Sequence, residues 1–272
     1  MADNEGYIAK PSADCCLKGS IHKGEPRGLF ETVQGVETYI SSPQGKSNGN
    51  ILLYFPDVWG FFSNGFLIMD GFADAGYLVL GLDYFRGVSL LAIIVVDDNA
   101  EELDGVGPCL ETPERSQRPI NPDFDYEAWK KKHIAFADAT VPGWVEAVKS
   151  RFGKPQTKYC FGAPYVCNEL AGKTCAAGAF AHPAFLKEHH FRQLNKPLFL
   201  SCSEIDHTFD AEARREALTI LQEEKKAYNF QLFSGVEHGF ALRGNMDDPY
   251  ERYVKEESLR SIAQWFDFWL SQ

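Results

Sequence analysis

The sequence lacks any long hydrophobic segment. Residues 1–16 contain no apolar core of signal-peptide length, and the one apolar run, Val88–Val96, spans only nine residues. A membrane-spanning helix needs about 20 such residues. We therefore expect a soluble, intracellular and cytoplasmic protein with no membrane partner.

Basic residues are also scarce. The chain has 27 Lys and Arg against 38 Asp and Glu, which gives a formal net charge of −11. Because such a field repels phosphate backbones, nucleic acid is excluded as an expected partner. An anionic substrate would have to be attracted by local arginines.

Cysteine is present but shows no regular spacing. Seven cysteines, an odd number, fit reduced thiols better than a disulfide framework. The adjacent Cys15 and Cys16 lie near His22, but no second pair of metal ligands follows them. We expect no metal and no organic cofactor.

Alternating strands and helices predict one α/β domain over residues 1–272, an assignment that suits a chain of 272 residues with 44% hydrophobic side chains. The expected fold is a mostly parallel, doubly wound sheet with helices on both faces. Expected strands cover 36–40, 50–55, 77–82, 175–181, 198–203 and 230–233; expected helices cover 66–76, 141–152, 164–172, 211–226 and 249–270. Pro142 suits the first turn of its helix. Residues 88–120 fit no pattern and predict an irregular surface insert, with a lid over the site as the alternative.

Three reactive side chains follow predicted strands in the order Cys160, Asp206, His238. A nucleophile, then a carboxylate, then a histidine near the C-terminus is the order in which an α/β-hydrolase assembles its catalytic triad. Because parallel strands end at one edge of a sheet, these residues should meet there. Cys160 would attack as a thiolate at a helix N-terminus, His238 would carry the proton and Asp206 would orient the imidazole.

Other residues at the same edge could bind the substrate. The backbone N–H groups of Val58 and Phe161 stand where such enzymes form an oxyanion hole. Arg86 and Arg243 fall on loops, where guanidinium groups can bind a substrate carboxylate.

Together these motifs resemble the dienelactone hydrolase family, especially its fungal members. The motifs are Pro56-Asp57-Val58-Trp59-Gly60, Leu82-Asp83-Tyr84-Phe85-Arg86-Gly87, Cys160-Phe161-Gly162, Asp206 and His238-Gly239-Phe240. The resemblance implies the same triad and oxyanion hole, and a clamp for a substrate carboxylate formed by Arg86 and Arg243. Asp57 stands where bacterial members of the family have a glutamate that hydrogen-bonds the resting thiol. Trp59 would lie at the pocket edge.

The chain departs from that family before its nucleophile. Lys158 replaces the first glycine of Gly-x-Cys-x-Gly, and the approach, residues 154–159, is not the apolar run that a central strand should have. One explanation is a gene model that lost residues here and gained 88–120. The other is a genuinely shortened strand that misplaces Cys160.

The sequence therefore predicts a hydrolase that opens a lactone or ester, carboxylate-bearing or polyketide-like, through a cysteinyl acyl-enzyme. Alternatives are a lyase, isomerase or cyclase of secondary metabolism on the same fold, because a fold does not fix the reaction, or a catalytically impaired small-molecule-binding protein. Monomer and homodimer both stay open.

Overall fold

The structure is a computed structural model of the chain, and it describes residues 6–11, 19–87, 125–153, 157–160, 162–173 and 175–272. For Tyr126 and residues 157–160 it describes the backbone only. The predicted insert at 88–120 lies outside the described residues.

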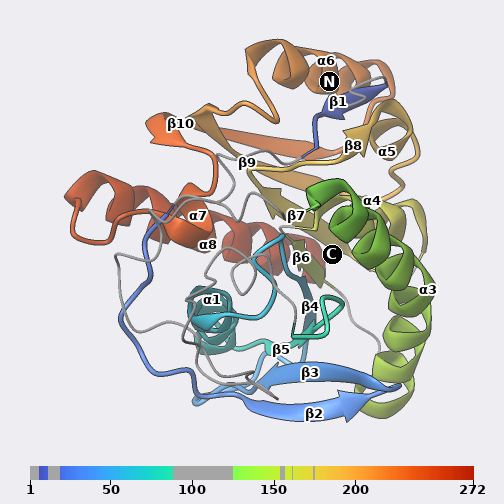
Figure 1. Cartoon of the computed structure of the whole chain (residues 1–272), viewed down its shortest axis with the longest axis vertical. Helices are drawn as coiled ribbons and strands as arrows, with labels where there is room; N and C mark the ends of the chain where they lie inside the picture. Colours follow the sequence, from blue (N-terminus) through green and yellow to red (C-terminus); the bar gives the residue numbers. More distant parts are fainter. Residues whose placement is uncertain (1–5, 12–18, 88–124, 154–156, 161, 174) are drawn as a thin grey trace.

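Among these residues the chain forms an eight-stranded sheet in the order β10-β9-β7-β6-β4-β5-β3-β2 (Figure 1). The strands are β2 (Leu29–Val33), β3 (Val36–Ser41), β4 (Ile51–Phe55), β5 (Leu78–Leu82), β6 (Thr157–Cys160), β7 (Ala177–Ala181), β9 (Leu198–Ile205) and β10 (Tyr228–Glu237). From β5 to β10 all neighbours are parallel, whereas β3 runs antiparallel to both β2 and β5. The predicted α/β-hydrolase fold with a mostly parallel sheet is confirmed.

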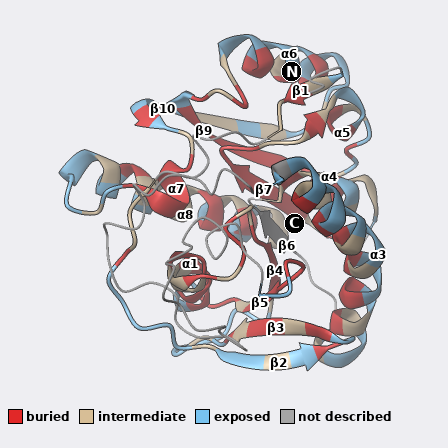
Figure 2. Cartoon of the chain, viewed as in Figure 1, coloured by how far each residue is buried: buried red, intermediate tan, exposed pale blue. Residues whose placement is uncertain are grey.

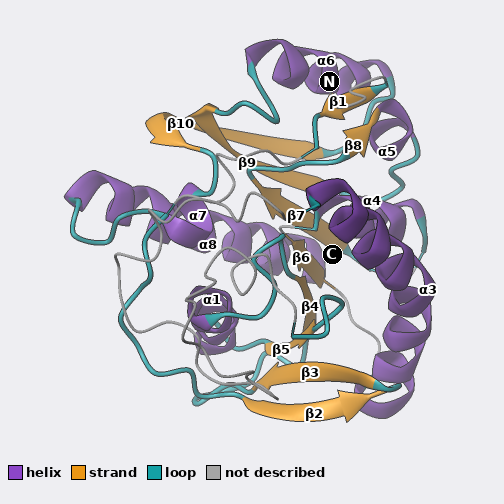
Figure 3. Ribbon diagram, in the orientation of Figure 1, coloured by secondary structure: helices purple, strands orange, loops and turns teal. Residues whose placement is uncertain are grey.

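Helices cover both faces of this sheet (Figure 3). The helices are α1 (Ser63–Asp74), α3 (Tyr126–Phe152), α4 (Ala163–Ala171), α5 (Glu188–Arg192), α6 (Ala211–Glu223), α7 (Phe240–Arg243) and α8 (Pro249–Leu270). Side chains alternate along β4, so Leu53 and Phe55 pack with α3, α4, α5 and α6, while Leu52 and Tyr54 pack with α1, α7 and α8.

The central strands are buried on both sides, as Figure 2 shows. Every residue of β4 and of β7 is buried, which is why these segments read as unbroken apolar runs. Each large side chain of this kind contributes about 1.5–3 kcal/mol by leaving water. Trp144 of α3 packs against Phe55, and its indole N–H donates to Thr38 Oγ1 at 2.9 Å, so the polar end of this buried ring is also paired.

The helix that precedes β6 is much longer than predicted. The apolar spacing indicated a helix beginning at Val141, but α3 begins at Tyr126 and contains Pro142 in its interior. An internal proline costs about 3 kcal/mol because it removes a backbone hydrogen bond and crowds the preceding turn. The added turns bury Trp129, His133 and Ala137, and this packing offsets the cost.

Strand β6 is short but pairs fully with its neighbours. Its four residues align with Leu52–Phe55 of β4 and with Ala177–Phe180 of β7. Cys160, its last residue, is therefore level with Phe55 and Phe180. The backbone of β6 is continuous with the sheet despite its polar sequence.

A small antiparallel pair, β1 (Tyr7–Ala9) with β8 (Leu186–Lys187), was not predicted. Lys10 N–H donates to Thr208 O at 2.8 Å, which fixes this N-terminal strand beside the loop that follows β9. In the described part of the chain, no helix is long and apolar enough to span a membrane.

Candidate active site

Asp206 and His238 form a buried pair at the carboxyl edge of the sheet. Asp206 directly follows β9, and His238 directly follows β10; the His238 N–H donates to Ile205 O at 3.0 Å. His238 Nδ1 lies 3.0 Å from both carboxylate oxygens of Asp206. Their side chains are 6% and 1% exposed, so solvent screens the pair little.

Hydrogen bonds from its own loop hold the Asp206 carboxylate. The donors are Thr208 N (2.9 Å), Phe209 N (3.0 Å), Thr208 Oγ1 (2.8 Å) and Ser203 Oγ (3.1 Å). Burial alone would raise the pKa of Asp206, but the charge of His238 and these hydrogen bonds outweigh burial and lower that pKa below its usual value. Asp206 is therefore ionised and fixed in orientation.

Three residues around His238 were not predicted as site residues. Thr208 Oγ1 lies 3.1 Å from His238 Nδ1, and the His182 ring meets the His238 ring edge-on at 4.9 Å. The His207 ring lies 5.2 Å from that of His238. Burial lowers the pKa of His182 well below its usual value, with the charges of His238 and Arg243 acting in the same direction. His182 is therefore neutral beside His238.

Cys160 ends β6, in the middle of the same edge. Its side chain and the whole of Phe161 lie outside the described residues. The backbone still places the segment: Gly162 N donates to Phe55 O at 3.1 Å, and α4 begins directly afterwards with Pro164 in its first turn, as predicted. The N-terminus of α4 therefore lies directly after Cys160, where the helix dipole favours negative charge.

The loop after β4 is a tight turn closed by Asp57. Its carbonyl accepts from Gly60 N at 2.9 Å, and its carboxylate accepts from Trp59 N at 2.9 Å. Gly60 has φ +63°, a left-handed conformation that favours glycine. Asp57 and Val58 both line the pocket described below.

The two predicted clamp arginines do not line that pocket. Arg243 is buried: its guanidinium is ion-paired with Asp57 and lies 4.9 Å from the Trp59 ring centre. Gly239 makes room for it, since a Cβ there would lie 2.5 Å from Arg243 Nη2. Arg86 is exposed, and its guanidinium packs 4.5 Å from the Phe136 ring. Trp59 also lies off the pocket, in the core beside Phe62.

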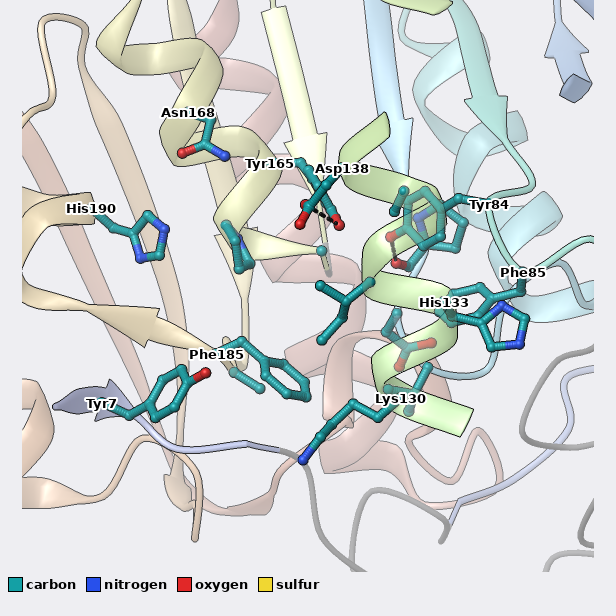
Figure 4. A pocket seen from close by; sticks show the side chains of 18 of the residues that line it. Tyr7, Tyr84, Phe85, Lys130, His133, Asp138, Tyr165, Asn168, Phe185 and His190 are labelled. Carbon is teal, nitrogen blue, oxygen red and sulfur yellow. Dashed lines mark hydrogen bonds between the residues drawn. The ribbon is translucent and has the colours of Figure 1, made fainter. Parts of the chain in front are cut away.

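A cavity of about 380 Å³ opens at this edge. It is lined by Asp57, Val58, Gly162, His182 and His238 together with residues of α3, α4, α5 and the N-terminal strand. Figure 4 shows two walls: Tyr84, Phe85, Lys130 and His133 on one side, and Tyr7, Phe185 and His190 on the other. The volume and the aromatic lining suit a small organic molecule.

A family model supplies the decisive comparison. The model of the dienelactone hydrolase family matches residues 36–270. The chain belongs to the dienelactone hydrolase family. This membership makes it a hydrolase of the ester or lactone type.

Relatives within the dienelactone hydrolase family match the chain along its full length. It is 38% identical to Dienlactone hydrolase 1 of Gibberella moniliformis over 282 residues, which cover 100% of both chains. It is 35% identical to Dienlactone hydrolase 2 of the same organism, over 98% of this chain and 99% of the other. Hydrolase tropI of Talaromyces stipitatus is 31% identical, over 96% and 98% of the two chains.

Solved structures support the fold. TT1662 of Thermus thermophilus superposes with a TM-score of 0.62 at 14% identity, over 92% of this chain and 100% of the other. A dienelactone hydrolase of Anabaena variabilis gives a TM-score of 0.55 at 11% identity, over 91% and 99%. Among the residues that the structure describes, no group of three His, Cys, Asp or Glu side chains could hold a metal ion.

Proposed function

We propose that this dienelactone hydrolase-family protein cleaves a lactone or ester with Cys160 as nucleophile, His238 as general base and acid, and Asp206 as the carboxylate that orients His238. The observation that carries the proposal is the buried Asp206–His238 pair on the cavity, at the edge where β6 ends in Cys160. Nδ1 of His238 is occupied by Asp206, so Nε2 is the nitrogen left for proton transfer.

The position of Cys160 in the sheet supports its part in this proposal. Its register partners, Phe55 and Phe180, each lead within two residues into the cavity lining, at Pro56 and at His182. Gly162, two residues after Cys160, lines the cavity as well. The backbone end of β6 is thus flanked, on both neighbouring strands, by residues that line the cavity.

In the proposed reaction His238 takes the proton of the Cys160 thiol, and the thiolate attacks the substrate carbonyl carbon. The tetrahedral intermediate collapses, the C–O bond to the leaving oxygen breaks, and His238 returns the proton to that oxygen. A water molecule then gives a proton to His238 and attacks the thioester, which releases the carboxylic acid and restores the thiol.

Two backbone N–H groups would stabilise the oxyanion in this proposal, those of Val58 and Phe161. Val58 lies in the turn that Asp57 closes, and Arg243 holds the Asp57 carboxylate from behind. The proposal therefore gives Asp57 and Arg243 the task of fixing the turn, with Trp59 packed behind them. A preorganised donor of this kind contributes about 3 kcal/mol to the transition state.

Product mass tests the proposal against a lyase, isomerase or cyclase. Each lactone should give one product heavier by one water, and each aryl ester should give an acid and a phenol whose summed mass exceeds that of the ester by one water. Cys160→Ala should abolish turnover while the fold stays intact. Cys175→Ala is the matched control, because Cys175 is buried under α4 with its sulfur on Glu169 O at 3.4 Å. Products of unchanged mass, or an active Cys160→Ala variant, would refute the assignment.

A further inference from the structure

One wall of the cavity carries a buried histidine. His133 of α3 is 3% exposed and lines the cavity. Among the described residues no side chain hydrogen-bonds either ring nitrogen, and the backbone of Tyr84 can pair with only one of them, so at least one nitrogen is left without a partner. A buried polar group left in this state costs about 1–3 kcal/mol, so a partner supplied by a bound molecule would be favoured.

The surroundings of His133 are aromatic. Its ring lies 4.8 Å from the Trp129 ring and 5.4 Å from the Phe85 ring, and those two rings stack at 5.4 Å with 5° between their planes. Burial lowers the pKa of His133, and together with the charges of Arg86 and Lys132 it outweighs a hydrogen bond with the Tyr84 backbone that acts to raise that pKa. The imidazole is therefore neutral, with one nitrogen that donates and one that accepts.

The arginines near this wall lie off the cavity lining, and the lysine on it is paired. Arg243 is paired with Asp57, and Arg86 packs on Phe136 away from the cavity lining. Lys130, which does line the cavity, forms an ion pair with Glu127 at 2.6 Å. Of the lining carboxylates, Asp138 accepts a hydrogen bond from Tyr165. Besides the paired Lys130, the wall presents aromatic faces and a neutral imidazole to the cavity.

We propose that His133 determines substrate specificity by hydrogen-bonding a hydroxyl or keto oxygen on the aromatic ring of an uncharged lactone or ester. This inference rests on the proposed function and names the substrate class of that same site. An uncharged substrate takes the place of the carboxylate-bearing one expected from the sequence. The substrate ring would be recognised by stacking on Phe85 and Trp129 and by one hydrogen bond to the neutral His133. A site built to pair a substrate hydroxyl rejects an analogue without it far more strongly than a purely apolar pocket does.

The test compares ring-hydroxylated dihydrocoumarins with their methyl-substituted and carboxylated counterparts. The unmodified protein should turn over the best hydroxylated lactone with a kcat/KM about tenfold or more above that of the methyl form, and the carboxylated lactone should be the poorest. His133→Phe should reduce the hydroxyl preference to within about twofold, and His133→Gln, which keeps a donor and an acceptor, should restore part of it. His189→Phe is the control, because His189 lines the same cavity but is exposed.

Binding separates this inference from the proposed function. Calorimetry on the Cys160→Ala protein, with and without His133→Phe, measures the hydroxyl preference without any turnover. A preference that appears in binding and is lost with His133→Phe supports the inference even if no lactone is hydrolysed. An equal loss for hydroxyl and methyl forms, or a preference for the carboxylated lactone, would overturn it.

Discussion

The guanidinium of Arg243 is enclosed between the carboxylate of Asp57 and the indole of Trp59. The Arg243 side chain is 1% exposed, and that of Asp57 is 13% exposed. Through this ion pair the short helix after His238 is tied to the turn after β4, which lines the cavity. Removal of one partner should therefore affect stability as well as the site.

Arg243→Met should lower the free energy of unfolding by about 3 kcal/mol, because it leaves the Asp57 charge without its buried partner. The double variant Asp57→Asn with Arg243→Met should recover part of that loss, since no unpaired charge remains. Urea unfolding of the unmodified protein, the Asp57→Asn and Arg243→Met single variants and the double variant gives the coupling energy directly.

Lys10→Met is the control for this cycle. Lys10 and Asp210 form an ion pair in which both side chains are about 40% exposed, so its loss should cost less than about 1 kcal/mol. Additive effects of the Asp57 and Arg243 substitutions would contradict the coupling inferred from the structure.

Thr208→Val should slow hydrolysis about tenfold with little change in KM. The substitution removes the hydroxyl that contacts both Asp206 Oδ1 and His238 Nδ1 and so loosens the orientation of the imidazole. Steady-state kinetics on an aryl ester would measure the effect, with Thr219→Val, a surface threonine bonded to Arg215 O, as the control. A Thr208→Val enzyme that keeps full kcat would show that the hydroxyl has no part in positioning.

Lys255 should make stability depend on pH. Burial lowers the pKa of Lys255 from 10.5 to about 7, and its ammonium group donates to His22 Nδ1. The folded pKa lies below the unfolded one, so between about pH 7 and 10.5 the unfolded chain binds more protons. Stability should therefore rise with pH across that window, and its Lys255 contribution should be lost as the pH falls to 7.

Lys255→Met should remove that rise and make the protein more stable than the unmodified chain at pH 6. Thermal unfolding at half-unit pH steps would measure both effects, with the exposed Lys131→Met as the control. The prediction fails if the pH profiles of the Lys255→Met and unmodified proteins run parallel.

The strands that the sequence predicted are those whose burial leaves a direct signal, whereas β1, β2, β6 and β8 were not among them. Segments such as β4 and β7 are apolar on both faces, and the residues that follow them lie at one edge by the rule for parallel sheets. That rule placed Asp206 beside His238 although 32 positions separate them. Applied to the residue after β7, it would also have found His182.

The start of α3, the cavity wall formed by β1 and the contacts of the two arginines depend on tertiary packing, which no local sequence pattern encodes. Pro142 read as a helix start, yet tertiary packing of Trp129 and His133 carries α3 well past it. Tyr7 reaches the cavity only because β1 pairs with β8, about 180 residues further along the chain. Arg86 and Arg243 lie on loops as predicted, but the side-chain contacts with Phe136 and Asp57 that take them off the cavity lining follow from packing.

In the proposed reaction Cys160 carries the acyl group, and His238, oriented by Asp206, takes the proton of the Cys160 thiol. Rapid-quench mass spectrometry with p-nitrophenyl acetate tests this most directly, since it locates the acetyl group by peptide mapping. We expect about one acetyl group per chain on Cys160, formed at least a hundredfold more slowly in Asp206→Asn. Acetylation of another residue, or an equal rate in Asp206→Asn, would contradict it.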